Sequence, residues 1–215
     1  RESRVQSVEA RRLDPERPDD QLSIAYDSAA GVRARVGRAP DRQLNVVMAQ
    51  GDVEWSVRDG SDRALPLQRA GRDGPLHVAG VEGERYTLVF RNLSERVYEV
   101  VATVDGLDVM SGQPGSLRRH GYVLRPGALL RIEGFRKSQQ EVAAFRFAAP
   151  SRAYAANTEA GDPRNIGVLG AALFELSLPG QPPATPRRRD GRTPNAFPAD
   201  AGAPYAPPPR YPATR

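Results

Sequence analysis

Residues 84–104, with the sequence ERYTLVFRNLSERVYEVVATV, carry the clearest strand pattern in the chain. Every second residue is apolar from Tyr86 to Phe90, and the same alternation runs from Tyr98 to Val104. A period of two is typical of strands that turn one face toward a hydrophobic core. Because only a few residues join the two halves, the pattern predicts an antiparallel hairpin.

Further strand-forming segments lie on both sides of this predicted hairpin. The segments expected to form strands are 44–48, 53–57, 76–81, 84–92, 97–104, 121–124, 129–133, 142–147 and 165–176. Turn-forming pairs such as Asp59-Gly60 and Pro126-Gly127 separate some of them, because these residues adopt the backbone angles that tight turns need. The sequence therefore predicts an all-β fold, an antiparallel, jelly-roll-like β-sandwich over residues 44–178.

The composition divides the chain into three regions. Residues 1–43 are polar and are predicted to form an N-terminal arm, with one short strand around Leu22 and Tyr26. Residues 44–178 form the predicted β-sandwich domain, which is long enough to bury a core without disulfides. Residues 179–215 are rich in Pro and Arg and are predicted to be an extended or disordered tail, because they can bury little apolar area.

The net charge of +5 is concentrated in the tail. Six arginines and two aspartates follow residue 179, which gives the tail a charge of +4 and leaves +1 for the rest. A nearly neutral folded domain argues against a nucleic-acid-binding protein. No apolar run is long enough to predict a transmembrane segment. The chain has no cysteine, which excludes thiol catalysis and thiolate zinc sites.

Four short motifs resemble one known group of proteins. They are GYVLRPG at 121–127, IEGFR at 132–136, FRF at 145–147 and NIGVLG at 165–170. Over residues 84–175 the chain is similar to a β-sandwich domain of uncharacterised bacterial exported proteins and lipoproteins. The resemblance implies an exported protein in the periplasm, on an outer-membrane lipid anchor or at the extracellular surface. It implies no catalytic residue, because none is assigned in that group.

Aromatic side chains are the candidates for ligand binding. Trp55, Tyr122 and Tyr154 could form a platform that stacks on sugar rings. Tyr86 and Tyr98 lie in predicted strands and are expected in the core instead. A carbohydrate-binding module of the cell envelope is therefore one alternative function.

Two aspartates, Asp105 and Asp108, lie close together in a predicted loop. Calcium takes several loop oxygens at once, so this pair is the candidate metal site. An Asp-Gly pair such as Asp105-Gly106 is also a common turn signal, so a turn without metal is the alternative. No cofactor other than calcium is expected. The spacing of His77 and His120 does not bring them together, and both are expected to be solvated or hydrogen-bonded.

The leading prediction is a non-catalytic protein that works by association. The sequence contains no nucleophile elbow, phosphate loop or dinucleotide fingerprint, which argues against an enzyme. An extended arm can pack on a sheet edge of a neighbour, so the arms predict a homo-oligomer or filament at the cell surface, or binding to another envelope protein. A metal-dependent hydrolase is the second alternative, after the carbohydrate-binding module. The tail residues expected to make contacts are Arg187, Arg188, Arg189, Tyr205 and Tyr211.

Overall fold

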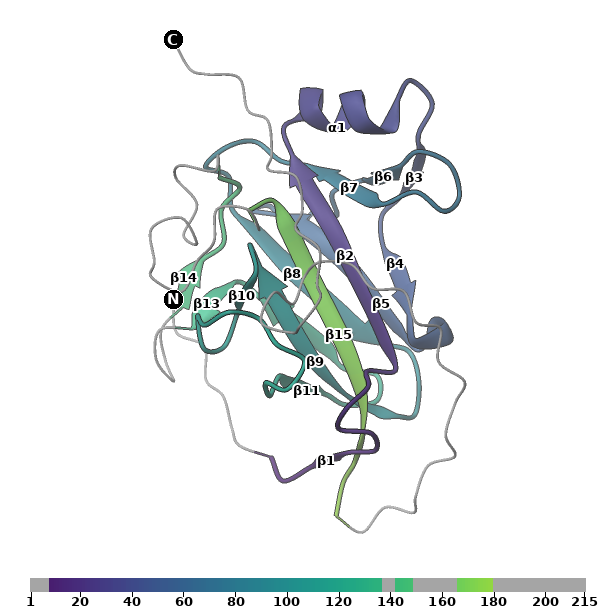
Figure 1. The fold of residues 1–215 in the computed structure, drawn as a ribbon, viewed down its shortest axis with the longest axis vertical. Helices are drawn as coiled ribbons and strands as arrows, with labels where there is room; N and C mark the ends of the chain where they lie inside the picture. Colours follow the sequence, from purple (N-terminus) through teal and green to yellow (C-terminus); the bar gives the residue numbers. More distant parts are fainter. Residues whose placement is uncertain (1–7, 137–141, 149–165, 180–215) are drawn as a thin grey trace.

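The computed structural model describes residues 8–136, 142–148 and 166–179, which form a mostly β structure with one α-helix (Figure 1). The elements in chain order are β1 (Arg11–Arg12), β2 (Asp20–Asp27), α1 (Ala29–Val36), β3 (Asp41–Gln43), β4 (Val46–Met48), the 3-10 turn η1 (Ala49–Gly51), β5 (Val53–Asp59), β6 (Leu67–Arg69), β7 (Leu76–Ala79), β8 (Tyr86–Asn92), β9 (Val97–Val104), β10 (Leu107–Asp108), β11 (Tyr122–Leu124), β12 (Leu129–Ile132), β13 (Gly134–Arg136), β14 (Val142–Ala144) and β15 (Val168–Ser177).

The larger sheet is built around its longest strand, β15. Its main path runs β10-β9-β15-β2-β7-β6-β3, with β1 also paired to β15 and β11 to β9. In Figure 1, β15 and β2 lie side by side along the middle of the molecule. All residues of β15 except the last are buried, because the sheet is covered on both faces at this point.

The smaller sheet is antiparallel and has the order β12-β8-β5-β4, and β13 and β14 form a separate pair. One core cluster contains residues from both sheets, including Tyr98 and Leu173 from the larger sheet and Trp55 and Phe90 from the smaller one. The Trp55 ring stacks on the Phe90 ring with 5.3 Å between centroids. The inward faces of the two sheets therefore share a single hydrophobic core.

The predicted hairpin at 84–104 is wrong in its pairing, although both strands exist. Among the described residues, β8 pairs with β5 and β12, whereas β9 pairs with β15, β10 and β11. The connection instead carries the chain from one sheet to the other. The Asn92 side chain supports this crossing by donating to the carbonyl oxygens of Arg96 at 2.7 Å and Leu124 at 3.2 Å.

The larger sheet is mixed rather than purely antiparallel, because β2 and β7 run parallel. A parallel neighbour needs a crossover, and here it includes α1, a helix that was not predicted from the sequence. Ser28 caps this helix by accepting a bond of 3.1 Å from the Gly31 N–H, and Val32 and Val36 form its buried stripe. Two apolar residues one turn apart give little sequence signal.

The strand predicted around Leu22 and Tyr26 is present as β2, in the interior of the larger sheet. The segment 1–43, expected as an arm, thus contributes β1, β2, α1 and β3 to the described structure. Of the predicted tail, only Pro179 lies within the described residues. No helix in the ranges 8–136, 142–148 and 166–179 is both long and apolar enough to cross a bilayer.

Removing the Phe90 ring tests the shared core. Phe90→Ala is expected to lower the free energy of unfolding by about 3–5 kcal/mol, because the ring is fully buried against Trp55. Urea unfolding followed by circular dichroism measures the change. Val47→Ala in β4 is the control, because its side chain is 55% exposed, and a change within about 0.5 kcal/mol is expected. Equal losses in both variants would contradict the shared core.

Candidate functional site

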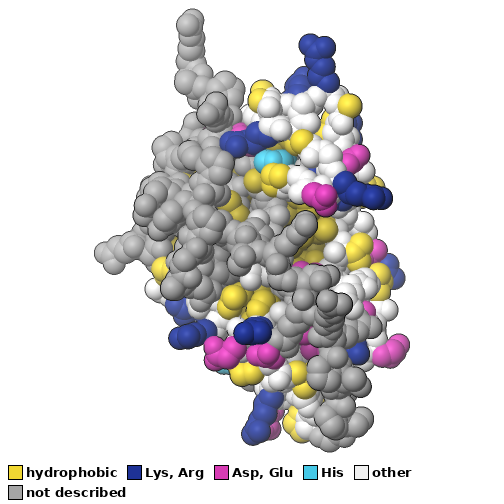
Figure 2. Space-filling model, turned by 45° about the vertical axis from the view of Figure 1, so that its right-hand side comes forward, with side chains coloured by type: hydrophobic (Ala, Val, Ile, Leu, Met, Phe, Trp, Pro, Cys, Tyr) yellow, Lys and Arg dark blue, Asp and Glu magenta, His cyan; other side chains and the backbone are white. Residues whose placement is uncertain are grey.

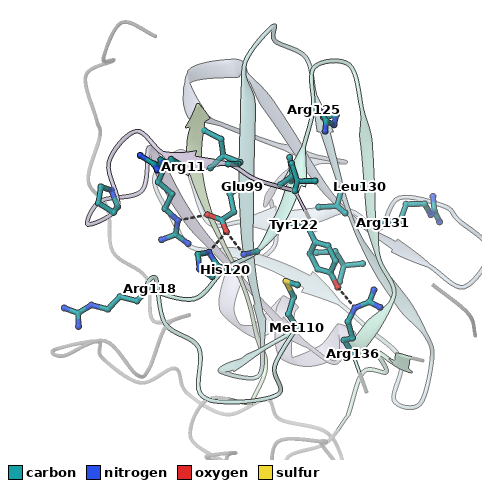
Figure 3. A pocket seen from close by; sticks show the side chains of 18 of the residues that line it. Arg11, Glu99, Met110, Arg118, His120, Tyr122, Arg125, Leu130, Arg131 and Arg136 are labelled. Carbon is teal, nitrogen blue, oxygen red and sulfur yellow. Dashed lines mark hydrogen bonds and ion pairs between the residues drawn. The ribbon is translucent and has the colours of Figure 1, made fainter. Parts of the chain in front are cut away.

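A cleft of about 1330 Å³ lies beside β11 and β12, where the chain passes from one sheet to the other (Figure 3). Segments from β1, the β10–β11 connection, β11, β12 and β13 line it. Its charged residues are mostly basic. They are Arg11, Arg12, Arg118, Arg125, Arg131 and Arg136, against Glu16, Glu99 and Glu133. Arginines therefore outnumber glutamates by three among the lining residues.

One wall of the cleft is held by an ion pair between Arg12 of β1 and Glu99 of β9. The Arg12 Nε donates to Glu99 Oε2 at 2.5 Å, and both side chains are less than a tenth exposed. The same guanidinium donates to the carbonyl oxygens of Leu117, at 2.5 Å, and Arg119. It also lies 3.6 Å above the centre of the Phe174 ring. One arginine thus joins β1, β9, β15 and the β10–β11 connection.

The second oxygen of Glu99 is also engaged. Glu99 Oε1 accepts a bond of 2.6 Å from the Gly121 N–H, and the Nδ1 of His120 lies 3.5 Å from the same oxygen. A side chain at Gly121 would collide with the carbonyl oxygen of Val100, so glycine permits this close approach. Figure 3 shows Glu99 and His120 on one side of the cleft, with Tyr122 and Arg136 on the other.

A small apolar cluster lies on the outer face of the larger sheet, beneath the β10–β11 connection. It consists of Val101, Val168, Ala172 and Phe174, and Leu117 packs against it. This cluster is separate from the main core. The Arg12 contacts hold the connection over it, so the wall of the cleft rests on a buried apolar surface.

The other arginines of the cleft differ in how they are engaged. Arg131 binds Asp62 at 2.7 Å, and this hydrogen bond lowers the pKa of the Asp62 carboxyl. Arg136 Nε donates to the Tyr122 hydroxyl at 3.4 Å. The side chains of three others form no hydrogen bond or ion pair within the described part of the chain; these are Arg11, Arg118 and Arg125. Such guanidinium groups are available to a ligand.

Of the aromatic residues predicted to bind a ligand, only Tyr122 is found in the cleft. It is half-buried, on β11. Trp55 is fully buried in the core, where its ring cannot stack on a ligand. Tyr154 lies outside the described residues, as do the predicted tail contacts Arg187, Arg188, Arg189, Tyr205 and Tyr211. Tyr86 and Tyr98 are buried, which confirms the core positions expected for them.

The candidate calcium residue Asp105 forms part of a tight turn. Asp105 and Gly106 both have positive φ, 54° and 78°, as a type I′ turn between β9 and β10 requires. Asp105 Oδ1 accepts bonds from the Tyr26 hydroxyl at 2.7 Å and the Gly167 N–H at 2.8 Å. Burial raises the pKa of Asp105 to about 6.

The second candidate calcium residue, Asp108, caps the next turn. Its Oδ1 accepts bonds from the Ser111 N–H at 2.7 Å and hydroxyl at 2.6 Å, and burial raises the pKa of this carboxyl. Its Oδ2 is buried and has no hydrogen-bond partner in the part of the chain that the structure describes. No group of three or more His, Asp or Glu side chains placed to share a metal ion occurs among the described residues.

The two histidines differ in their exposure to solvent. His77 is buried in β7, and burial lowers its pKa. The His120 side chain is 93% exposed at the cleft.

A separate polar network links the two sheets away from the cleft. The Tyr98 hydroxyl donates to Asp52 at 2.7 Å, and Arg96 binds Glu175 at 2.5 Å. Burial, followed by the Asp52 bond, raises the pKa of Tyr98.

The residues that build the cleft were not predicted from the sequence. They are Arg12, Glu99 and the arginines near them. One signal was present, since Glu99 is the one charged residue in the predicted strand 97–104. Its partner could not be found from sequence, because Arg12 lies 87 residues away. No protein-family model matches this chain, and no significant match was found among curated proteins or solved structures.

The ion pair can be tested by removing its cation. Arg12→Ala is expected to lower the free energy of unfolding by about 3–5 kcal/mol, because Glu99 would remain buried without its partner. Chemical unfolding measures the change. The control is Arg11→Ala. Arg11 is next to Arg12 in β1, but its side chain has no partner among the described residues, so a change within about 0.5 kcal/mol is expected. A comparable loss in the control would contradict the role of Arg12.

Asp105 predicts a pH dependence of stability. Its folded-state pKa of about 6 lies above the ordinary 3.8, so the folded state binds more protons between these values and stability falls as pH rises from about 4 to 6. Asp105→Asn removes this titration, and asparagine tolerates the positive φ. Unfolding measured from pH 4 to 7 should show the variant gaining up to about 3 kcal/mol relative to the wild type. A constant difference would contradict the raised pKa.

Proposed function

We propose that this protein acts by association rather than catalysis, and that its cleft binds an anionic ligand. The observation that carries the proposal is the excess of arginine in one cleft, with three guanidinium groups that have no partner among the described residues. Guanidinium groups bind carboxylate, sulfate and phosphate through paired N–H donors. A volume of about 1330 Å³ suits an extended ligand better than a small ion.

For the arrangement of the two sheets, we propose the antiparallel, jelly-roll-like β-sandwich expected from the sequence, with the parallel β2–β7 pair as its one departure among the described strands. The shared core of the two sheets supports this proposal. In a β-sandwich, rigid strands hold loops that bind ligands. The cleft combines both, because β11 and β12 flank it and the β10–β11 connection closes one side.

The charge of the cleft restricts the ligand for each function expected from the sequence to an acidic one. A carbohydrate-binding module would take acidic polysaccharides here, since neutral sugars leave the unpaired arginines without counter-charge. A subunit of an assembly would offer this cleft to an acidic partner. Both belong to one class of function, association in the bacterial cell envelope, which the resemblance over residues 84–175 favours. On the face shown in Figure 2, basic and acidic side chains are interspersed over the described part, so this face carries charges of both signs.

The test compares binding of heparin, poly-L-glutamate and neutral dextran to the full chain by isothermal titration calorimetry. At least one polyanion is expected to bind and dextran is not, with affinity falling as salt increases. The variant Arg118→Gln/Arg125→Gln should bind at least about tenfold more weakly, because each lost charge-assisted bond costs about 1.5 kcal/mol or more.

The matched control is Arg38→Gln/Arg72→Gln, which removes the same charge from exposed positions away from the cleft. Its affinity should stay close to that of the wild type. Equal losses in both double variants, or dextran binding as strong as polyanion binding, would overturn the proposal.

A further inference from the structure

The cleft is bounded by strand edges rather than by strand faces. Successive side chains of a strand point to opposite faces, so a strand face would contribute alternate residues to a cleft. Here consecutive residues border it, 121–123 at β11 and 130–134 at β12 and β13. Such runs place the backbone edges of β11 and β12 along the cleft.

Neither strand has a neighbour on its second side within the described ranges. β11 pairs with β9 alone, and β12 pairs with β8 alone. The larger sheet therefore ends locally at β11, and the smaller sheet ends at β12. An unpaired edge presents backbone N–H and C=O groups that can bind a further strand.

The hydrogen bonds of β12 show which backbone groups face its partner β8. The Asn92 N–H donates to the carbonyl oxygen of Ala128 at 3.0 Å. Residue pairs along an antiparallel ladder alternate between bonded and non-bonded pairs. Leu130, opposite Phe90, is therefore also bonded to β8, and so is Ile132.

Leu129 and Arg131 fall on the alternate positions, so their backbone N–H and C=O groups point away from β8. The next outward carbonyl oxygen, that of Glu133, already accepts a bond of 2.9 Å from the Phe145 N–H. This edge thus receives an extended segment of its own chain at Glu133. Across Leu129 and Arg131 no described segment pairs with it.

From these observations we infer that an acidic, extended segment of a partner polypeptide adds a strand to β12 in this cleft, an inference that rests on the proposed anion binding. Backbone bonds to Leu129 and Arg131 set its register. Every second side chain of the segment lies on the same face, so acidic residues at alternate positions meet arginines of the cleft together. Arg125, at the start of the turn that leads into β12, is the unpaired group on this side of the cleft that receives one of them.

The charge of the cleft selects against this chain's own tail as the occupant. Residues 179–215 carry six arginines and two aspartates, so their charge has the same sign as the excess in the cleft. Juxtaposed like charges disfavour binding. A segment of another protein that is rich in Asp and Glu is the complement.

The edge also favours a polypeptide over other polyanions. A polysaccharide or nucleic acid lacks the regular N–H and C=O groups that pair with Leu129 and Arg131. Single-stranded nucleic acids are commonly held by stacking of bases on several aromatic rings. Among the described residues that line the cleft, Tyr122 is the one Phe, Tyr or Trp, and the guanidinium of Arg136 lies 5.9 Å from its ring centre.

The test uses a ten-residue peptide that alternates Glu and Thr, added to the full chain and followed by residue-resolved hydrogen exchange. The amides of Leu129 and Arg131 should exchange at least about tenfold more slowly when the peptide is bound. The amides of Leu130 and Ile132 are the internal control, because they already bond to β8 and should change little.

A second peptide with the same side chains, N-methylated along its backbone, keeps the charge and loses the donors. It should bind at least about tenfold more weakly. Arg131→Pro should weaken binding of the unmethylated peptide beyond the effect of Arg131→Ala, since both remove the guanidinium and only proline removes the outward N–H. Heparin should bind both Arg131 variants alike.

The outcomes separate this inference from the proposed function. Equal binding of the two peptides, or heparin binding with no peptide binding, would overturn strand addition and leave anion binding intact. Binding of none of the anions would overturn both. Slower exchange at Leu129 and Arg131 with the unmethylated peptide alone supports strand addition.

Discussion

The buried ion pair between Arg12 and Glu99 holds together the segments that form one wall of the cleft. One guanidinium group binds a carboxylate of β9 and two carbonyl oxygens of the β10–β11 connection, and it covers the ring of Phe174. Desolvation offsets much of the attraction in such pairs, so its net contribution to stability over an apolar pair is small. Its structural role is to fix one arrangement of β1 and the connection on the larger sheet.

The same ion pair determines the charge that the cleft presents. Both oxygens of Glu99 are engaged, one by Arg12 and the other by the Gly121 N–H. Glu99 therefore does not counter the charges of Arg118 and Arg125, although all of them line one cleft. The interaction that orders the wall thus also leaves the positive excess on which the proposed anion binding depends.

The sequence predicted the strands better than their neighbours, for a physical reason. Alternation at Tyr86–Phe90 and Tyr98–Val104 shows that each strand buries one face, but two strands bury the same faces whether they pair or oppose each other across a core. The structure has them opposed. At the site, Tyr122 was predicted as a ligand-binding aromatic residue. The Arg12–Glu99 contact joins residues 87 apart, so it left no local pattern in the sequence.

A basic edge strand has two consequences for association. An unpaired edge is a hazard for β proteins, because identical edges can pair and aggregate. Arg125, at the turn before β12, opposes that pairing, since a second copy would bring the same charge to the contact, whereas Asp62 balances the charge of Arg131. The same arginine would attract a strand of opposite charge. If the proposed strand addition holds, this charge disfavours self-association through β12 and favours an acidic partner, and a homo-oligomer would then form through a different surface.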